Sequence, residues 1–318
     1  MDTIYNLESD SSMLDELWDC IRNRNIEQKF LYQWDWAELY YLQKHSNKMY
    51  TGHTLEKNDF LDFYKKNIEI NSSWNLDIIS LGCGNSENEV SILENINTKN
   101  ISYYWVDSSK SMLELSVENL KHLNLNKKFI CTDFSTNIFR QELQQLTFNS
   151  DDKVFVFFSN TFWNIQHTNI IDILQNLLNK GEKLWLDLRT RKWETIEDDL
   201  EISTILADDL HRTEVRNSFL EILKWYWVDT SSWELILKTT KVDIIDALKF
   251  EFSFLLKEKS ILDVKWQKIV ILPWETIKIQ QIYSFSPTWL INFFEEHWFK
   301  LIDKQTKWYR WQFLFEKK

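Results

Sequence analysis

Two aspartates are the side chains best suited to hold a small polar ligand, because each ends an apolar run that is typical of a buried strand. Asp107 is placed to accept hydrogen bonds from both hydroxyls of a ribose, a pairing that suits a carboxylate. Asp133 is suited to accept from an adenine amino group. The alternatives are a helix N-cap at Asp107 and a turn carboxylate at Asp133. Ser108 or Ser109 can supply the cap, which favours the ribose role.

A glycine turn precedes both aspartates. The apolar run 78–81 leads into Gly82-Cys83-Gly84, and a helical pattern begins near Glu87. We expect backbone N–H groups to point at whatever lies above this turn, and the glycines to let a ligand approach the backbone closely. A pyrophosphate-binding fingerprint has a third glycine. The turn therefore disfavours a nicotinamide dinucleotide and favours a nucleoside cofactor without phosphates, such as S-adenosylmethionine.

A polar segment follows the fourth apolar run, 154–158. Asn160, Thr161 and Asn164 lie there, and we expect them to face the reactive end of the cofactor, although they are also ordinary turn formers. Phe134 offers its backbone N–H or its ring to the adenine. Ribose, adenine and sulfonium each then have a counterpart in the chain, all at the carboxyl ends of predicted strands, where doubly wound sheets bind ligands.

The elements that must position these residues alternate between apolar strands and amphipathic helices, which predicts an α/β fold with a Rossmann-like, doubly wound parallel sheet. After residue 190 this alternation gives way to segments rich in β-branched and aromatic residues, which predicts an inserted, mostly antiparallel α+β cap. We predict four parts: an N-terminal helical lid at 1–73, a cofactor-binding core at 74–190, the cap at 191–285, and a final helix and strands at 286–318 that complete the core.

Charge and composition narrow the partners. The 318-residue chain has a net charge of -11 and no basic block, which disfavours nucleic acid as a partner. It has no apolar run long enough to cross a membrane and no signal-peptide pattern, so we expect a cytoplasmic protein. Its three scattered cysteines predict neither a disulfide framework nor a metal site. We expect a monomer that acts on a small molecule.

The balance of glycine and tryptophan is unusual. The chain has 4 Gly and 17 Trp, and together they make up about 7% of the residues, which is the usual share of glycine alone. Trp274, after Pro273, and Trp298, after a predicted helix at 288–297, stand where turns call for glycine. We hypothesise that most of these codons are read as glycine through a reassigned stop codon. The alternative is a protein that is truly rich in tryptophan.

The ordered motifs resemble those of class I S-adenosylmethionine-dependent methyltransferases, and more narrowly those of the histidine-specific family, whose members trimethylate the α-amine of histidine. The family's Gly-x-Gly-x-Ser-x-Lys loop corresponds to Gly82, Gly84 and Ser86, with Asn88 in place of the lysine. Trp36, Trp163 and Trp274 stand where three other motifs of the family have glycine. The matching segments are 81–84, 106–108, 133–134, 158–164, 32–40 and 274–277.

The resemblance implies a methyltransferase sheet, S-adenosylmethionine as cofactor and a small amine or amino acid as substrate. It implies cofactor contacts from Gly82, Cys83, Gly84, Ser86, Asp107, Ser108, Asp133, Phe134, Asn160 and Thr161. Tyr50 and Asn164 correspond to residues that contact the substrate. The family's charged Glu-x-Ser pair falls on Gln280 and Ile282, which cannot make its contacts to an imidazole. Methyl transfer therefore carries over, and histidine as the substrate does not.

No catalytic acid or base is expected, because the sulfonium is already activated and proximity and orientation supply the rate. Two further functions stay open: methylation of another amine, amino acid or peptide, and a non-catalytic fold that binds S-adenosylmethionine or keeps only the shape. The bulky Trp36 and Trp163, as written, favour the non-catalytic fold because their rings would fill the pocket. A nicotinamide-dependent oxidoreductase is disfavoured by the missing third glycine.

Overall fold

The computed structural model describes residues 3–7, 10–27, 29–30, 57–68, 75–97, 99–147, 150, 152–158, 161–190, 220, 231–264, 267–307 and 310–318. Two of the predicted site residues, Tyr50 and Asn160, lie outside the described residues, as does Trp36. The chain divides into two compact units, and each is described by itself. The first comprises residues 1–8, 53–192 and 285–318, and the second comprises 9–52 and 193–284.

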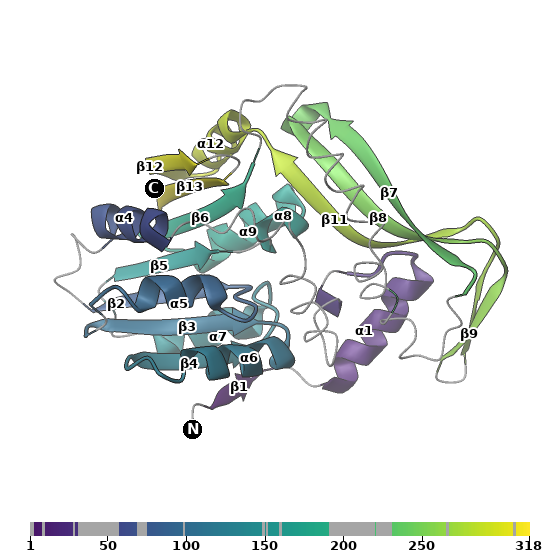
Figure 1. Cartoon of the computed structure of the whole chain (residues 1–318), viewed down its shortest axis with the longest axis horizontal. Helices are drawn as coiled ribbons and strands as arrows, with labels where there is room; N and C mark the ends of the chain where they lie inside the picture. The colour runs from purple at the N-terminus through teal and green to yellow at the C-terminus, as the bar shows by residue number, and fades with distance from the viewer. Residues whose placement is uncertain are drawn as a thin grey trace. The chain divides into compact units, whose positions relative to one another are not determined.

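The first unit is built on a mixed sheet with the strand order β1-β4-β3-β2-β5-β6-β13-β12 (Figure 1). Neighbouring strands from β1 to β6 pair in parallel, whereas β13 runs antiparallel to β6 and β12 antiparallel to β13. The strands span Ile4–Asn6 (β1), Leu76–Leu81 (β2), Ile101–Asp107 (β3), Asn126–Cys131 (β4), Asp152–Phe157 (β5), Lys183–Arg189 (β6), Phe299–Lys307 (β12) and Arg310–Lys317 (β13).

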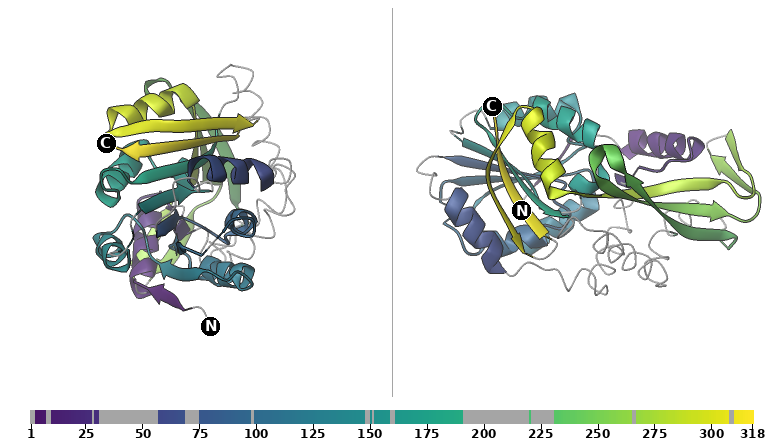
Figure 2. Two further views of the ribbon diagram at one scale, coloured as in Figure 1. Left: turned by 90° about the vertical axis from the view of Figure 1, so that its left-hand side faces the viewer. Right: turned by 90° about the horizontal axis from the view of Figure 1, so that it is seen from above.

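Helices cover both faces of this sheet. One face is covered by α4, α5 and α6, and the other by α7, α9 and α12 (Figure 2). Their bounds are Lys57–Asn67 (α4), Glu87–Leu93 (α5), Lys110–Leu120 (α6), Asn137–Leu146 (α7), His167–Leu177 (α9) and Pro287–Glu296 (α12), with the short α8 at Thr161–Asn164. This arrangement confirms the predicted doubly wound α/β sheet, and it places β2 at the point where the strand order reverses.

Aromatic packing stabilises the centre of the sheet. Every residue of β2 is buried, which is why this strand reads as an apolar run without alternation. On the neighbouring β3 and β4, Trp105 stacks on Tyr103 with a centroid separation of 4.2 Å and on Phe129 at 5.0 Å. Close packing of this kind holds the carboxyl ends of the strands rigid, and these ends carry the predicted site residues.

The second unit contains the antiparallel sheet that the sequence predicts. Its order is β11-β8-β7, from strands Thr276–Phe285 (β11), Ala247–Leu256 (β8) and Trp233–Val242 (β7). A separate hairpin pairs β9 (Ser260–Val264) with β10 (Gln267–Ile271). Helix α1 (Asp10–Arg22) contributes Leu17, Trp18 and Ile21 to the same hydrophobic cluster as the sheet. Residues from the start of the chain and from 193–284 therefore share one core.

Two features differ from the sequence-based expectation. Residues 4–6 form β1, a strand that pairs with β4, where we expected a helical lead-in. The third strand ends at Cys131, and not at Asp133 and Phe134. Both differences have the same physical source: hydrogen bonds between strands that are distant in sequence decide where pairing begins and ends, and local apolar pattern does not reveal them.

No described helix has the length and apolarity that a membrane crossing requires.

Candidate cofactor site

The glycine turn after β2 uses its N–H groups within the protein. The Gly82 and Cys83 N–H groups both donate to the Val106 carbonyl, at 2.8 and 3.2 Å, and the Gly84 N–H donates to Oδ2 of Asp107 at 2.8 Å. This corrects the expectation that the turn points these N–H groups at a ligand. The turn is a rigid platform over which a nucleoside can lie, and these three amides do not form a cradle for phosphate.

Both glycines have positive φ, at +65° for Gly82 and +59° for Gly84. A Cβ added at Gly82 would lie 2.3 Å from Oγ1 of Thr161, whereas one at Gly84 would meet nothing within 4 Å. The first glycine is therefore required by the close approach of the segment after β5. The second is required only by its backbone conformation and leaves open space beside it.

Asp107 lies at the end of β3 with its carboxylate directly beside this turn. Oδ2 accepts the Gly84 N–H and Oδ1 accepts the Ser109 N–H, each at 2.8 Å. Burial raises the pKa of the Asp107 carboxyl, and the backbone N–H groups of Ser109, Gly84 and Ser108 oppose that rise. Each oxygen has a second acceptor position, so the two carboxylate oxygens suit the two hydroxyls of a ribose as donors.

The competing role of Asp107, a helix N-cap, is filled by another residue. The Ser109 side chain caps α6 by accepting from the Met112 N–H at 3.2 Å. Ser86 is fully buried, and its hydroxyl lies 2.8 Å from that of Ser116 on α6, which in turn donates to the Gly84 carbonyl at 2.7 Å. These hydroxyls fix the turn from beneath. We missed Ser116, because a serine inside an amphipathic helix gives no sequence signal of such a role.

Asp133 and Phe134 follow β4 in a tight turn. Oδ1 of Asp133 accepts from the N–H and the hydroxyl of Ser135, at 2.9 and 2.6 Å, so its carboxylate also stabilises its own turn. The Phe134 ring is buried and meets Phe157 edge-to-face at 5.8 Å. Of the two contacts that we expected Phe134 to offer an adenine, the backbone N–H is thus favoured over the ring.

Two hydrogen bonds tie the segment after β5 to its surroundings, one to the glycine turn and one to helix α5. Oγ1 of Thr161 donates to the Gly82 carbonyl at 3.1 Å, and Nδ2 of Asn88 donates to the Phe158 carbonyl at 2.6 Å. Asn88 is the residue that stands where the related family has a lysine. The sequence marks this substitution but not its consequence, which depends on the distance between two segments that are 70 residues apart.

Asn164 ends the short helix α8, and its Oδ1 atom is buried with no hydrogen-bond partner among the residues that the structure describes. A buried acceptor without a donor costs about 1–3 kcal/mol. Such an atom is best explained by a ligand or an ordered water that supplies the donor. The side chain is on the same segment as Thr161, which contacts the glycine turn.

Gln280 and Ile282 belong to β11 in the second unit. Both are half-buried, and Ile282 packs against the hydrophobic cluster of that unit. A substrate contact from Ile282 would therefore compete with packing of this side chain in the hydrophobic cluster.

On the same strand, the Tyr283 hydroxyl is beside a charged pair on β8, Lys249 and Glu251, whose Nζ–Oε2 distance is 2.6 Å. Burial raises the pKa of Tyr283.

Other reactive groups near the turn are inert. Burial raises the pKa of the Cys83 thiol well above its ordinary value, and the nearby Asp107 charge adds to the rise, so the sulfur stays protonated and is not a nucleophile. Within the described ranges, no cluster of three or more His, Cys, Asp or Glu side chains is arranged to hold a metal ion. The chemistry at this edge is consequently binding and orientation.

Comparison with protein families identifies the class. The model of a histidine-specific, S-adenosylmethionine-dependent methyltransferase family matches residues 12–188, more than half of the chain. The protein is therefore an S-adenosylmethionine-dependent methyltransferase, as the sequence motifs predicted. Within that class it belongs to the histidine-specific methyltransferase family. The cofactor of this family is S-adenosylmethionine, whose ribose hydroxyls suit the acceptor oxygens of Asp107.

Solved structures with similar folds are also methyltransferases, at low identity. One from Clostridium acetobutylicum is 12% identical, with a TM-score of 0.48 over 87% of this chain and 98% of the other. CalS10, an amino pentose methyltransferase of Micromonospora echinaspora solved with S-adenosylmethionine bound, is 11% identical, with a TM-score of 0.43 over 85% and 95%. None of the curated proteins compared with the chain matches it significantly.

Proposed function

We propose that this chain transfers the methyl group of S-adenosylmethionine to the nitrogen of a small amine. An α-amino acid is the candidate class of acceptor, and histidine is one member of that class to be tested, because Gln280 and Ile282 replace the pair that would hold its imidazole. The proposal is supported above all by Asn164, whose buried Oδ1 atom lacks a partner among the described residues. A carboxamide carries an acceptor oxygen and donor N–H groups. An α-amino acid presents an amine and a carboxylate, so one asparagine suits both of its polar ends.

In this function the Asp107 carboxylate holds the ribose and Asp133 holds the adenine amino group. The Phe134 N–H also contacts the adenine, while Gly82, Cys83 and Gly84 form the platform beneath the nucleoside. Ser108 lies at the edge of this platform. Bound S-adenosylmethionine supplies an activated methyl group. The segment after β5 is joined to the glycine turn by the Thr161–Gly82 hydrogen bond and to helix α5 by the Asn88–Phe158 hydrogen bond, and these two bonds fix the distance between platform and acceptor.

Methyl transfer from S-adenosylmethionine to the acceptor nitrogen needs no catalytic base in contact with the substrate. The lone pair of an unprotonated acceptor nitrogen forms a bond to the methyl carbon, and the carbon–sulfur bond breaks with its electron pair going to sulfur. S-adenosylhomocysteine leaves as a neutral thioether. The nitrogen gains the positive charge and releases any remaining proton to water. The protein contributes proximity and orientation, which supply about 7–11 kcal/mol when reactants are well positioned.

The test is a methyl-transfer assay with isotopically labelled S-adenosylmethionine and a panel of acceptors: histidine, other amino acids, small amines and a short peptide. We expect labelled product and stoichiometric S-adenosylhomocysteine with at least one amino acid or small amine. Asn164→Ala should raise KM for that acceptor far more than KM for the cofactor. Tight cofactor binding with no methylated product from any member of the panel would contradict the proposal and favour a non-catalytic fold.

A further inference from the structure

The described glycines of this chain share one backbone conformation, with positive φ. The three glycines that the structure describes, Gly82, Gly84 and Gly181, all have positive φ, between +59° and +86°. Side chains with a Cβ are strained in this region, and large ones are genuine outliers there. Two tryptophans nevertheless adopt it: Trp274 has a φ of +69° and Trp298 a φ of +71°.

Trp298 occupies the position after the end of α12, where glycine is most common. His297 caps that helix, and Trp298 follows it in the left-handed conformation. The next residue, Phe299, is fully buried and packs edge-to-face on Phe294 at 5.4 Å. A hydrophobic contact of this kind accompanies the glycine-ended helix motif. The indole itself is 67% exposed, so it gains no packing that would offset the strain.

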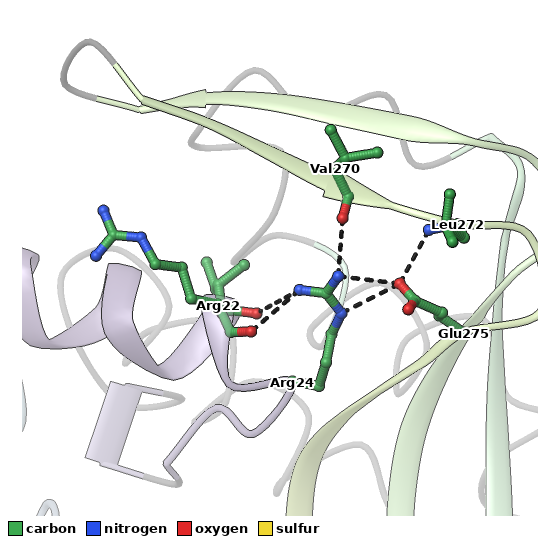
Figure 3. A network of polar contacts seen from close by, with 6 residues as sticks. Arg22, Arg24, Val270, Leu272 and Glu275 are labelled. Atoms are coloured by element: carbon green, nitrogen blue, oxygen red, sulfur yellow. Dashed lines mark hydrogen bonds and ion pairs between the residues drawn. The ribbon is translucent and has the colours of Figure 1, made fainter.

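Trp274 lies in a turn whose neighbouring residues form a network of polar contacts. Figure 3 shows Arg24, Val270, Leu272 and Glu275 of this network. The Glu275 carboxylate accepts from the Leu272 N–H and from the Arg24 guanidinium, each at 2.9 Å. Arg24 also donates to the Val270 carbonyl at 2.8 Å. These contacts fix the backbone on both sides of residue 274, which itself has positive φ, while Trp274 is 70% exposed. The conformation at 274 favours a residue without a Cβ.

We propose that residues 274 and 298 are glycine in the natural protein, because their codons are read as glycine and not as tryptophan. The composition agrees, since 17 tryptophans accompany only 4 glycines. Trp18 offers a contrast: it lies within helix α1 and belongs to the buried cluster of the second unit. The proposal covers positions where the backbone calls for glycine, and it leaves Trp18 as tryptophan.

The inference bears on the site without depending on the proposed function. Residue 163 lies in α8, between Thr161 and Asn164. If its codon belongs to the same class as those of 274 and 298, the natural site has no side chain at 163. The chain written with tryptophan would then differ from the natural enzyme within its cofactor-binding segment.

The direct test is peptide mass spectrometry of the protein purified from its source cells, together with the coding sequence. We expect glycine at 274 and 298, tryptophan at 18, and two different codons for these two groups. Tryptophan in the peptide at either 274 or 298, or one codon shared by all three positions, would overturn the proposal. Failure of methyl transfer would not affect these readouts, so the two proposals fail separately.

Stability measurements on the recombinant chain test the structural argument independently. We expect Trp274→Gly and Trp298→Gly each to raise the thermal midpoint by about 2 °C, because each relieves backbone strain at little loss of packing. Trp18→Gly is the matched control and should lower the midpoint by roughly 8 °C or more, since it empties a buried position. A midpoint that does not rise for either turn variant would overturn the argument from backbone conformation.

Discussion

We expect cofactor binding to depend most directly on the Asp107 carboxylate, and Asp107→Asn is the smallest change that tests this expectation. In the structure each carboxylate oxygen accepts one backbone N–H at 2.8 Å, from Gly84 and from Ser109. An amide keeps the size of the side chain but replaces one acceptor oxygen with a donor. One of the two backbone N–H groups then faces another donor, and the matching ribose hydroxyl loses its acceptor.

The magnitude follows from these contacts. Hydrogen bonds to a charged group contribute about 1.5–3 kcal/mol each. Removing the charge weakens both ribose contacts, and the amide abolishes one of them, so we expect a loss of about 3 kcal/mol. This corresponds to a dissociation constant for S-adenosylmethionine that is roughly 150-fold higher. Isothermal titration calorimetry on the purified chain measures it, with circular dichroism confirming that the variant is folded.

Asp77→Asn is the matched control. Asp77 is buried to a similar degree, its carboxyl pKa is also raised by burial, and it lies on β2, next to the strand that carries Asp107. It is near the amino end of its strand, however, so it is distant from the carboxyl edge of the sheet. We expect its effect on cofactor affinity to stay within about twofold. An Asp107→Asn affinity within threefold of wild type would refute the assignment of the ribose to this carboxylate.

Three further predictions concern the same edge of the sheet. Burial raises the pKa of the Asp107 carboxyl in the folded protein above its ordinary value, so the contribution of this group to stability is present below the ordinary pKa and is lost as pH rises through the folded pKa. Cofactor affinity should change in the opposite direction and strengthen as the carboxylate forms, which titrations from pH 4 upward will measure. Gly82→Ala should destabilise by about 2–3 kcal/mol in urea unfolding, because its Cβ would lie 2.3 Å from Oγ1 of Thr161, whereas Gly84→Ala, with open space around it, should cost only about 1 kcal/mol; equal costs would contradict the close approach. Asn88→Ala removes a 2.6 Å hydrogen bond to the carbonyl that precedes α8 and should lower kcat/KM about fivefold, and an unchanged value would show that this bond does not position the segment.

The central strands of the sheet were predictable because parallel strands buried on both faces need unbroken apolar runs. Leu76–Leu81 is buried throughout, and Asp152–Phe157 is buried from Val154 onward. The strand β1 was not predictable in the same way. It has only three residues, and what makes it a strand is its pairing with Phe129, Ile130 and Cys131 more than a hundred positions later. Local sequence contains no trace of that partner.

The site was predictable in part. The glycine turn and Asp107 are brought into contact, as their positions after neighbouring strands implied. The role of Ser109 as a helix cap also followed from sequence, because serine before a helical pattern is a standard N-cap. The bond from Asn88 to Phe158 did not, since it depends on how far β5 extends past β2. The residue types indicate which side chains can bind a ligand, whereas the register of the sheet determines which of these side chains lie in contact.

The preference for a cofactor without phosphates has a stronger physical basis than a missing glycine. The pairing of Leu81 with Val106 places the Val106 carbonyl where it accepts two consecutive N–H groups of the turn, and Asp107 takes a third. The helix that follows has Glu87 and Glu89 in its first turn, so negative charge already lies near its positive end. A pyrophosphate at this turn would meet one buried carboxylate and find these three amides engaged. We therefore expect a neutral ribose attached to a cationic sulfonium to meet a more favourable field at this turn than a pyrophosphate would, which is the physical reason to place S-adenosylmethionine here.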